Sequence, residues 1–347
     1  MFGLGVWNRQ QLQVAEAALE RREFEQAEFH LKKRWPLGFS DLNGHLLSVR
    51  TARRRGDLEA ANRRLQACQK RSGSDEWLEL EQQLLAIQQG NLEGVDELID
   101  RYAANPQLPE APWVLEAYIV GSLKILMSAY AQNLTHVGSE SSAHLERTRR
   151  FVEQWLASRT QKPDQVQGLV WRFQAHLFAH ALSEARTDID RALELDPNHR
   201  EARIMLAIFL TQEHPAEAAM QWQQLHEHDP DDVKTTLNFA DVRRRLGHLE
   251  EAQALLDQVL AQEPKNIPAL LDRGRVAQDL QDLAGAEIWF RNAYHLDPAS
   301  PEANLALSRC LQALGKTQAA MVFQDNFDRF QAEHRRQREA AKSLTPH

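Results

Sequence analysis

Residues 282–298 read DLAGAEIWFRNAYHLDP, and this stretch decides the fold. It contains His295 and Asp297 two residues apart, so it is either a chemical site or a structural unit. It ends in an acidic residue followed by proline, and earlier pairs of this kind occur at residues 196–197, 229–230 and 263–264. The successive spacings are 33, 34 and 34 residues. A fixed period near 34 is typical of a stacked helix-turn-helix array rather than of a catalytic motif.

The composition favours helices throughout the chain. Only 15 of the 347 residues are glycine, and alanine, leucine, glutamine, glutamate and arginine, which are good helix formers, dominate. Short breaks that contain glycine or proline separate segments of about a dozen residues. We therefore predict an all-α protein, an α-solenoid (superhelix) of about eight stacked helix-turn-helix hairpins.

The repeat over residues 267–300 resembles the tetratricopeptide repeat (TPR). That family has small residues midway along the first helix and early in the second, followed by an aromatic residue, an alanine and a proline. The residues of this chain at those places are Gly274, Ala286, Phe290, Ala293 and Pro298. Small residues let the two helices of a hairpin approach closely, and the aromatic ring fills the volume between layers. Asp297 then belongs to the turn, and His295 has no assigned chemistry.

The same spacing reaches both ends of the chain. In the first third, the predicted turn residues Arg22, Gly56 and Gly90 stand 34 residues apart. We predict four parts: 1–107, degenerate N-terminal TPR-like repeats; 108–165, an enlarged irregular hairpin; 166–330, a regular TPR array; and 331–347, a capping helix and tail. The enlarged hairpin should have a long helix over 111–132 and a polar loop over 133–142.

Cysteine content and hydropathy narrow the class of protein. Cys68 and Cys310 are far apart, which predicts neither a disulfide framework nor a cysteine metal cluster and suits a reducing compartment. The N-terminal residues lack the pattern of a secretory signal, so we expect a cytoplasmic protein. The most apolar window, residues 114–131, is interrupted by Glu116 and Lys124, which indicates a buried helix rather than a membrane span.

Candidate chemical motifs are few. His176 and His180 stand four residues apart, a spacing that can hold zinc on a helix, but no third ligand is near and we expect packing histidines. The acid-proline pairs repeat with the structural period, which makes each acid a turn residue. Nucleophile and phosphate-binding motifs do not occur. We predict no catalytic residue, no cofactor and no metal, with a metal-dependent enzyme as the remotest alternative.

Charge is unevenly distributed along the chain, whose net charge is −8. Residues 1–71 contain 14 basic and 8 acidic residues, whereas residues 73–124 contain 2 basic and 10 acidic ones. The basic segment from Arg50 to Arg71, with Arg53, Arg54 and Arg55, could contact the phosphates of a nucleic acid. Because it spans a predicted turn and includes acids, a solvated helix face is the preferred interpretation, and nucleic-acid binding is an alternative.

The resemblance implies a function on the concave face. In this family the first helix of each repeat lines that face and commonly holds a partner's segment. The register directs five side chains there, namely Asn238, Asp241, Asp272, Arg275 and Arg309. Arg275 and Arg309 stand one period apart and could meet an acidic partner. The clamp by which some members hold a chaperone's terminal carboxylate is not expected, because Leu271 occupies the place of its first lysine. We predict a non-enzymatic scaffold that binds a protein or peptide.

Overall fold

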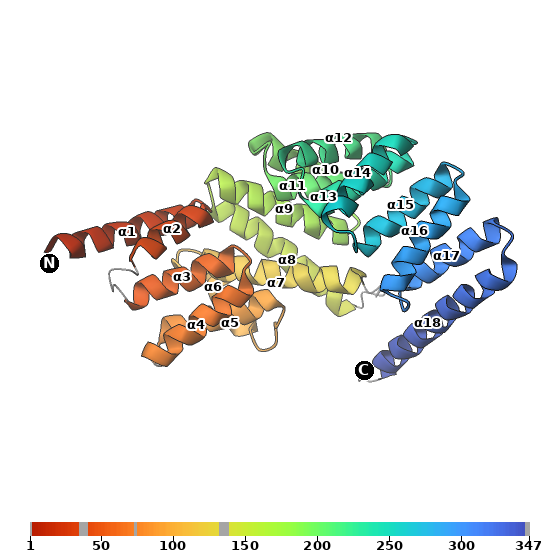
Figure 1. The fold of residues 1–347 in the computed structure, drawn as a ribbon. Coiled ribbons are helices and arrows are strands. Elements are labelled where there is room, and N and C mark those ends of the chain that lie inside the picture. The colour runs from red at the N-terminus through yellow and green to blue at the C-terminus, as the bar shows by residue number, and fades with distance from the viewer. Residues whose placement is uncertain (1, 35–40, 73–74, 132–138, 344–347) are drawn as a thin grey trace. The chain divides into compact units, whose positions relative to one another are not determined.

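The computed structural model describes residues 2–34, 41–72, 75–131 and 139–343, and it is helical throughout (Figure 1). The described residues contain 18 helices and no strand. The all-α, helical-repeat prediction is confirmed. The chain divides into two compact units, Met1–Ala202 and Arg203–His347, which are described separately.

The described residues of the first unit contain ten complete helices. They are α1 (Phe2–Glu20), α2 (Phe24–Arg34), α3 (Leu42–Arg54), α4 (Leu58–Ser72), α5 (Glu76–Gln89), α6 (Asp96–Ala104), α7 (Ala111–Ala131), α8 (Ser139–Ser158), α9 (Lys162–Phe178) and α10 (Leu182–Leu195). The first helices of neighbouring hairpins contact one another, in the order α1, α3, α5, α7 and α9. They therefore form a continuous inner layer of this unit.

Helix α11 (Arg200–Leu210) crosses the boundary between the units, and seven helices follow it. They are α12 (Pro215–His228), α13 (Val233–Arg245), α14 (Leu249–Gln262), α15 (Ile267–Asp279), α16 (Leu283–Leu296), α17 (Pro301–Ala313) and α18 (Thr317–Ser343). Here α13, α15 and α17 are the first helices that contact one another, as in the first unit.

The turns inside the hairpins follow the predicted period in backbone conformation as well as in sequence. Arg22, Gly56 and Gly90 all have positive φ, at 59°, 89° and 101°. Gly247, Gln281 and Gly315 repeat the feature 34 residues apart in the second unit. A left-handed residue after a helix ends it and redirects the chain, and glycine adopts this conformation at least cost. The period is thus a repeat of one turn geometry.

The stretch that decided the fold is the second helix of a regular hairpin. Ala286, Phe290 and Ala293 on α16 are fully buried in one core cluster. The hydroxyl of Ser300 accepts a hydrogen bond from the amide of Ala303 (3.2 Å), and Pro301 is the first residue of α17. This capping and the first-turn proline begin the next hairpin, as the repeat pattern predicts.

The central hairpin is enlarged, with some differences in its bounds. Helix α7 covers the predicted long helix except Gln132, which lies outside the described residues. Helix α8 begins at Ser139, inside the segment predicted to be a loop. Trp155 of α8 and Trp171 of α9 meet edge to face with ring centroids 4.9 Å apart, within the largest core cluster of the first unit. No helix of the described part of the chain is long and apolar enough to cross a membrane.

The C-terminal helix differs from the sequence prediction. Helix α18 is one helix of 27 residues from Thr317 to Ser343, with no break at residue 330. A separate capping helix beginning at residue 331 is therefore wrong, because that stretch has no glycine or proline to end the preceding helix. The remaining part boundaries stay a proposal.

Close packing of the two helices in a hairpin can be tested at Gly274. A Cβ atom there would lie 2.7 and 2.8 Å from the Cδ1 and Cζ atoms of Phe290. We expect Gly274→Ala to lower the free energy of unfolding by about 1–3 kcal/mol through overpacking, although alanine favours the helix by about 1 kcal/mol. Urea unfolding followed by circular dichroism measures the change.

The matched control is Gly5→Ala in α1, where an added Cβ atom meets nothing within 4 Å. Its stability should be unchanged or slightly higher. Equal stability of the Gly274→Ala variant and the native protein would contradict the packing argument.

Candidate functional site

A groove with a volume of about 440 Å³ opens on the inner layer of the first unit. It is lined by side chains from α1, α3, α5 and the start of α7: Arg9, Leu12, Gln13, Glu16, Asn43, Leu46, Leu47, Arg50, Trp77, Glu110 and Trp113. Leucines form its apolar part, and charged and amide groups surround them. A groove of this size and mixed lining suits a segment of another polypeptide.

Repeat register explains why these side chains meet. Arg9, Asn43 and Trp77 lie 13 residues before the positive-φ turn residues Arg22, Gly56 and Gly90. They therefore occupy the same position on three successive first helices and line one groove. The positions nine and six residues before each turn recur in the same way, as Gln13 with Leu47 and as Glu16 with Arg50.

Two tryptophans dominate the groove. Trp77 is 43% exposed, and its backbone N–H donates to the side chain of Asp75 (3.0 Å), which fixes it in the first turn of α5. Trp113 is partly buried, and the guanidinium carbon of Arg50 lies 4.0 Å from its ring centroid. The ring of Trp77 is thus open to a ligand, while one face of Trp113 is covered by a fixed cation.

A buried ion cluster lies next to the groove. The carboxylate of Glu81 accepts hydrogen bonds from Nε of Arg50 (2.6 Å) and Nε of Arg53 (3.0 Å). Glu81 and Arg53 are fully buried. Burial raises the pKa of Glu81, but the charges of Arg53 and Arg50 outweigh it, so its pKa is lowered. Arg50 is therefore held in the groove by a buried, ionised carboxylate, which would lose one of its two cationic partners if Arg50 moved away.

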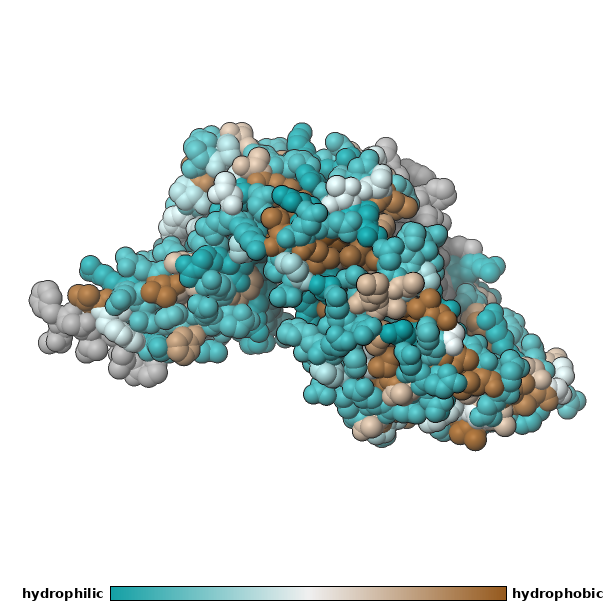
Figure 2. All heavy atoms as spheres, turned by 90° about the horizontal axis from the view of Figure 1, so that it is seen from above, coloured by the Kyte–Doolittle hydropathy of each residue, from teal (hydrophilic) through white to brown (hydrophobic). Residues whose placement is uncertain are grey.

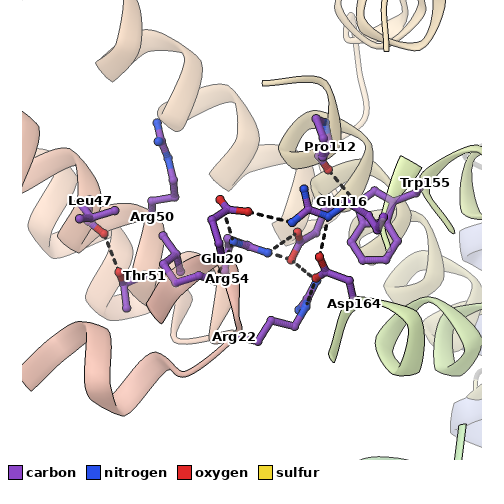
Figure 3. Close-up of polar contacts among 12 residues, drawn as sticks. Glu20, Arg22, Leu47, Arg50, Thr51, Arg54, Pro112, Glu116, Trp155 and Asp164 are labelled. Carbon is purple, nitrogen blue, oxygen red and sulfur yellow. Dashed lines mark hydrogen bonds and ion pairs between the residues drawn. The ribbon is translucent and has the colours of Figure 1, made fainter. Parts of the chain in front are cut away.

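A second cluster joins the first hairpin to α7 and α9 (Figure 3). Glu116 of α7 accepts from Nη2 of Arg22 (3.0 Å) and lies 3.2 Å from Nη2 of Arg54. Asp164 of α9 accepts from Nε of Arg22 (2.9 Å) and from Nε of Arg159 (2.6 Å). Burial raises the pKa of Glu116, but Arg22 and Arg54 outweigh it and lower this pKa to about 2.

Arg22 is the centre of this second cluster. It combines two carboxylate contacts with positions near the rings of Trp155 and Trp171, at 5.6 and 5.5 Å from the ring centroids. It is also a turn residue with positive φ, a conformation that is uncommon for a residue other than glycine. The side-chain contacts offset that conformational cost.

The prediction of a solvated basic face at Arg53 and Arg54 is wrong. Both arginines are buried and paired with acids 28 and 62 residues further along the chain. Arg55, the third residue of the run, is exposed. The excess of bases before residue 72 and of acids after it is explained in part by these pairs, because the basic segment binds the acidic one within the same unit.

The five predicted concave-face residues lie on α13, α15 and α17. Asn238 donates to the carbonyl of Lys234 in its own helix (2.8 Å), and Asp241 accepts from Nε of Arg245 (2.7 Å). Asp272 is ion-paired with Arg275, and burial raises its pKa more than Arg275 lowers it. Arg309 is exposed and makes no hydrogen bond or ion pair with any residue that the structure describes.

The sequence analysis did not predict the groove of the first unit, because it applied the repeat register only to the regular repeats of the second. Asn238 and Asp272 lie nine residues before the turns at 247 and 281, and Asp241, Arg275 and Arg309 lie six before their turns. The same two positions line the groove in the first unit. Counting back nine and six residues from Arg22 and Gly56 in the sequence would have identified the groove residues at these positions.

The histidine pair does not form the predicted geometry. Helix α9 ends at Phe178, and His180 is a turn residue with φ of 55°, so the two side chains do not share a helix. Nδ1 of His176 lies 2.9 Å from Asp188. Within the described ranges, no group of three or more histidine, cysteine, aspartate or glutamate side chains could hold a metal ion.

Comparison with known proteins identifies the repeat. Residues 209–272 match the model of the tetratricopeptide repeat family. Residues 209–272 are thus a tetratricopeptide repeat segment. The matched segment contains α12, α13 and α14 completely, including the predicted concave residues Asn238 and Asp241. No curated protein matches the sequence.

Several solved structures are similar to this chain. PilW, a type IV pilus biogenesis factor, is 20% identical with a TM-score of 0.48, and the match covers 65% of this chain and 97% of PilW. YrrB, titled a TPR protein with an unusual peptide-binding site, is 17% identical with a TM-score of 0.41, covering 61% and 96%. PilF of Pseudomonas aeruginosa is 18% identical with a TM-score of 0.42, covering 49% and 78%. We draw no functional conclusion from these matches.

Acid should destabilise the first unit through Glu116. Its pKa is about 2 in the folded protein and near 4.5 in the unfolded chain, so the unfolded chain binds more protons between these values. The stabilisation is complete above about pH 5, is lost as the pH falls toward 2, and is on the order of 3 kcal/mol. Urea unfolding followed by tryptophan fluorescence at neutral pH and at about pH 3.5 measures the part lost by that pH, which is on the order of 1 kcal/mol.

Glu116→Gln should lower the stability at neutral pH by about 3–5 kcal/mol, because Arg22 and Arg54 lose their shared anion, and should weaken the pH dependence. The control is Glu59→Gln, which removes an exposed partner of Arg63 and should change the stability by less than about 1 kcal/mol. If both substitutions have the same effect, the buried pairs do not stabilise this unit.

Proposed function

We propose that the protein is a non-catalytic scaffold that holds a segment of a partner protein against the first helices of its repeats. The observation that carries this proposal is the groove of the first unit, whose lining residues occupy the same repeat positions as the concave residues predicted in the second. The groove is preformed, because the buried Glu81 fixes one of its walls through Arg50. A preformed site reduces the ordering cost of binding.

The chemistry of the groove suits an extended peptide. The side-chain amide groups of Gln13 and Asn43 make no hydrogen bond within the described part of the chain. Both can therefore form hydrogen bonds with the backbone of a ligand. Trp77 offers an open ring to an apolar side chain. Arg9, which is exposed and likewise has no ion pair there, can contact a carboxylate.

The second unit adds a separate contact of the same kind. Arg309 is exposed on α17 and Arg275 is one period before it on α15. We propose that both meet acidic side chains of the partner, with Arg275 exchanging its contact with Asp272 for an intermolecular one. Arg309 has no ion pair within the described residues to give up on binding, whereas Arg275 gives up its ion pair with Asp272.

The alternatives have less support. Nucleic-acid binding would use Arg53, Arg54 and Arg55, but the first two are buried and neutralised by Glu81 and Glu116. A gel shift at low salt that depends on Arg55 would favour it. The cytoplasmic location and the non-enzymatic nature of the protein stay predictions.

The groove proposal can be tested with Trp77→Ala. We expect affinity capture followed by mass spectrometry to lose the proteins that the native chain retains, because an exposed aromatic anchor carries much of the binding energy at such sites. The control is Phe29→Ala, which removes another exposed aromatic ring, on the second helix α2. Both variants should keep the native circular dichroism, since neither ring is buried. Identical captured proteins for both variants would contradict the role of the groove.

The contact of the second unit can be tested by the double reversal Arg275→Glu and Arg309→Glu. It should weaken capture of an acidic partner at least tenfold, since attraction becomes repulsion at two points. Arg63→Glu with Arg191→Glu makes the same change of charge on the second helices α4 and α10 and should have no effect. Unchanged capture by the first double variant would place the contact elsewhere.

A further inference from the structure

The surface of the C-terminal helices carries several groups of apolar side chains (Figure 2). A groove of about 490 Å³ lies between the C-terminal halves of α14 and α16. Pro264 and Lys265 in the loop before α15 and Leu270 of α15 complete its lining. We call it the α14–α16 groove. It lies between second helices, so it is separate from the residues of the proposed concave face.

The equivalent position one period earlier is closed by hydrogen bonds. There, between α12 and α14, Nε2 of Gln258 donates to the carbonyl of Pro230 (2.9 Å). Gln262 donates to Asp231 at 3.4 Å. Beneath them, the ring of His226 bonds the hydroxyl of Thr236 (3.0 Å).

One period later the junction between α16 and α18 is closed as well. Nδ2 of Asn304 donates to the carbonyl of Pro298 (2.9 Å), and Asn326 donates to Oδ1 of Asn304 (3.2 Å). Tyr294 and Phe323 pack edge to face with ring centroids 5.1 Å apart. The second helices are therefore joined across this position at both neighbouring junctions.

The α14–α16 groove lacks every one of these closures. Asn292 stands one period after Gln258 and is shorter by one methylene, and Leu296, which has no donor, stands one period after Gln262. In the part of the chain that the structure describes, neither Asn292 nor Lys265 makes a hydrogen bond or an ion pair. The carbonyl of Pro264 accepts no bond from Asn292. The sequence thus opens one junction that its two neighbours keep closed.

The chemistry inside the groove is apolar with a basic rim. Leu270 is buried, Trp289 and Leu260 are partly buried, and Leu296 is 40% exposed. Lys265 and His295 are exposed at the edge, and none of the lining residues is acidic. Glu263, two residues before Lys265, already accepts a hydrogen bond from Asn266 (2.7 Å). The ammonium group of Lys265, with no carboxylate among the lining residues, favours an anionic ligand over a cationic one.

We propose that the α14–α16 groove binds a short segment of another protein that combines apolar side chains with an acidic one. The apolar side chains fill the space over Leu270 and Trp289. The carboxylate meets Lys265, and the ligand supplies the hydrogen bonds to Asn292 and the Pro264 carbonyl that the two neighbouring junctions make internally. Charge complementarity at Lys265 selects this occupant over a basic one.

The test uses the full chain and three fluorescein-labelled synthetic peptides. The first, Leu-Asp-Leu-Leu-Glu-Leu, carries both features. The second replaces its acids with lysine, and the third replaces its leucines with serine. We expect fluorescence anisotropy to detect binding of the first peptide and at least tenfold weaker binding of the other two. Equal binding of the leucine-lysine peptide would overturn the proposed charge selection, and equal binding of the serine peptide would overturn the apolar contact.

The decisive variant installs the closed junction in place of the open one. Lys265→Asp, Asn292→Gln and Leu296→Gln together reproduce the residues found one period earlier. We expect this variant to keep the native circular dichroism and melting temperature and to bind the first peptide at least tenfold more weakly. If it fails to fold, Lys265→Ala alone, at an exposed position, should weaken binding several-fold. Native affinity in the folded variant would overturn the proposal.

Two controls separate this groove from the other surfaces. Trp77→Ala and the double reversal of Arg275 and Arg309 should leave the affinity for the first peptide unchanged, whatever they do to capture of a concave-face partner. Loss of peptide binding in either would assign the peptide to the concave face and overturn the present assignment. Sedimentation should show the same oligomeric state for the native chain and the triple variant. If the native chain associates with itself and the triple variant does not, the occupant of the groove is a second copy of the chain and the proposal is overturned.

Discussion

Buried pairs between arginines and carboxylates fix the positions of the first helices in the N-terminal unit. Arg53 joins α3 to α5 through Glu81, Arg54 joins α3 to α7 through Glu116, and Arg22 joins the first turn to α9 through Asp164. A buried ion pair adds little to the free energy of unfolding compared with an apolar pair of similar size. Removing one partner, however, lowers this free energy strongly, because it leaves a buried charge unpaired. Each pair therefore specifies which helices must meet, and the groove at Trp77 depends on that register.

These buried ion pairs explain why charged residues lie inside the N-terminal unit. Residues that read as a basic surface segment are internal, and their acidic partners come from helices much later in the chain. Glu116 sits in the most apolar window of the sequence, where an isolated carboxylate would be strongly disfavoured. Its two arginine partners keep it ionised, which is why its pKa falls to about 2 despite burial. Apolar content and buried charge in α7 are thus parts of one arrangement.

Local features were predicted from the sequence, and non-local ones were not. The turn at Gly56 and the close approach at Gly274 depend on a single residue type in a repeated place, so the period alone predicts them. The burial of Arg54 depends on Glu116, 62 residues away, and no local pattern signals that contact. The concave register was predicted in the regular array, yet the groove at Trp77 was overlooked because degenerate repeats hide their alignment. Helix α18 was divided wrongly because a tail was expected where nothing ends the helix.

The binding surfaces proposed for this chain lie where its sequence departs from the repeat. Buried alanines and turn residues recur, because they set the spacing of the helices. Trp77 and Lys265 occupy positions that vary between repeats without disturbing that spacing. A solenoid can therefore change its ligand chemistry one hairpin at a time, provided that the contacts between the first helices stay intact.

Amide hydrogen exchange of the full chain, compared between the native protein and Glu81→Gln, tests most directly whether the buried pairs hold the first unit together. The account predicts faster exchange across both α3 and α5, as Arg50 and Arg53 lose their shared carboxylate, with α15 and α16 of the second unit unchanged. Exchange that rises only in the turn of α5 next to residue 81 would contradict it, because the helices would then keep their register without the pair.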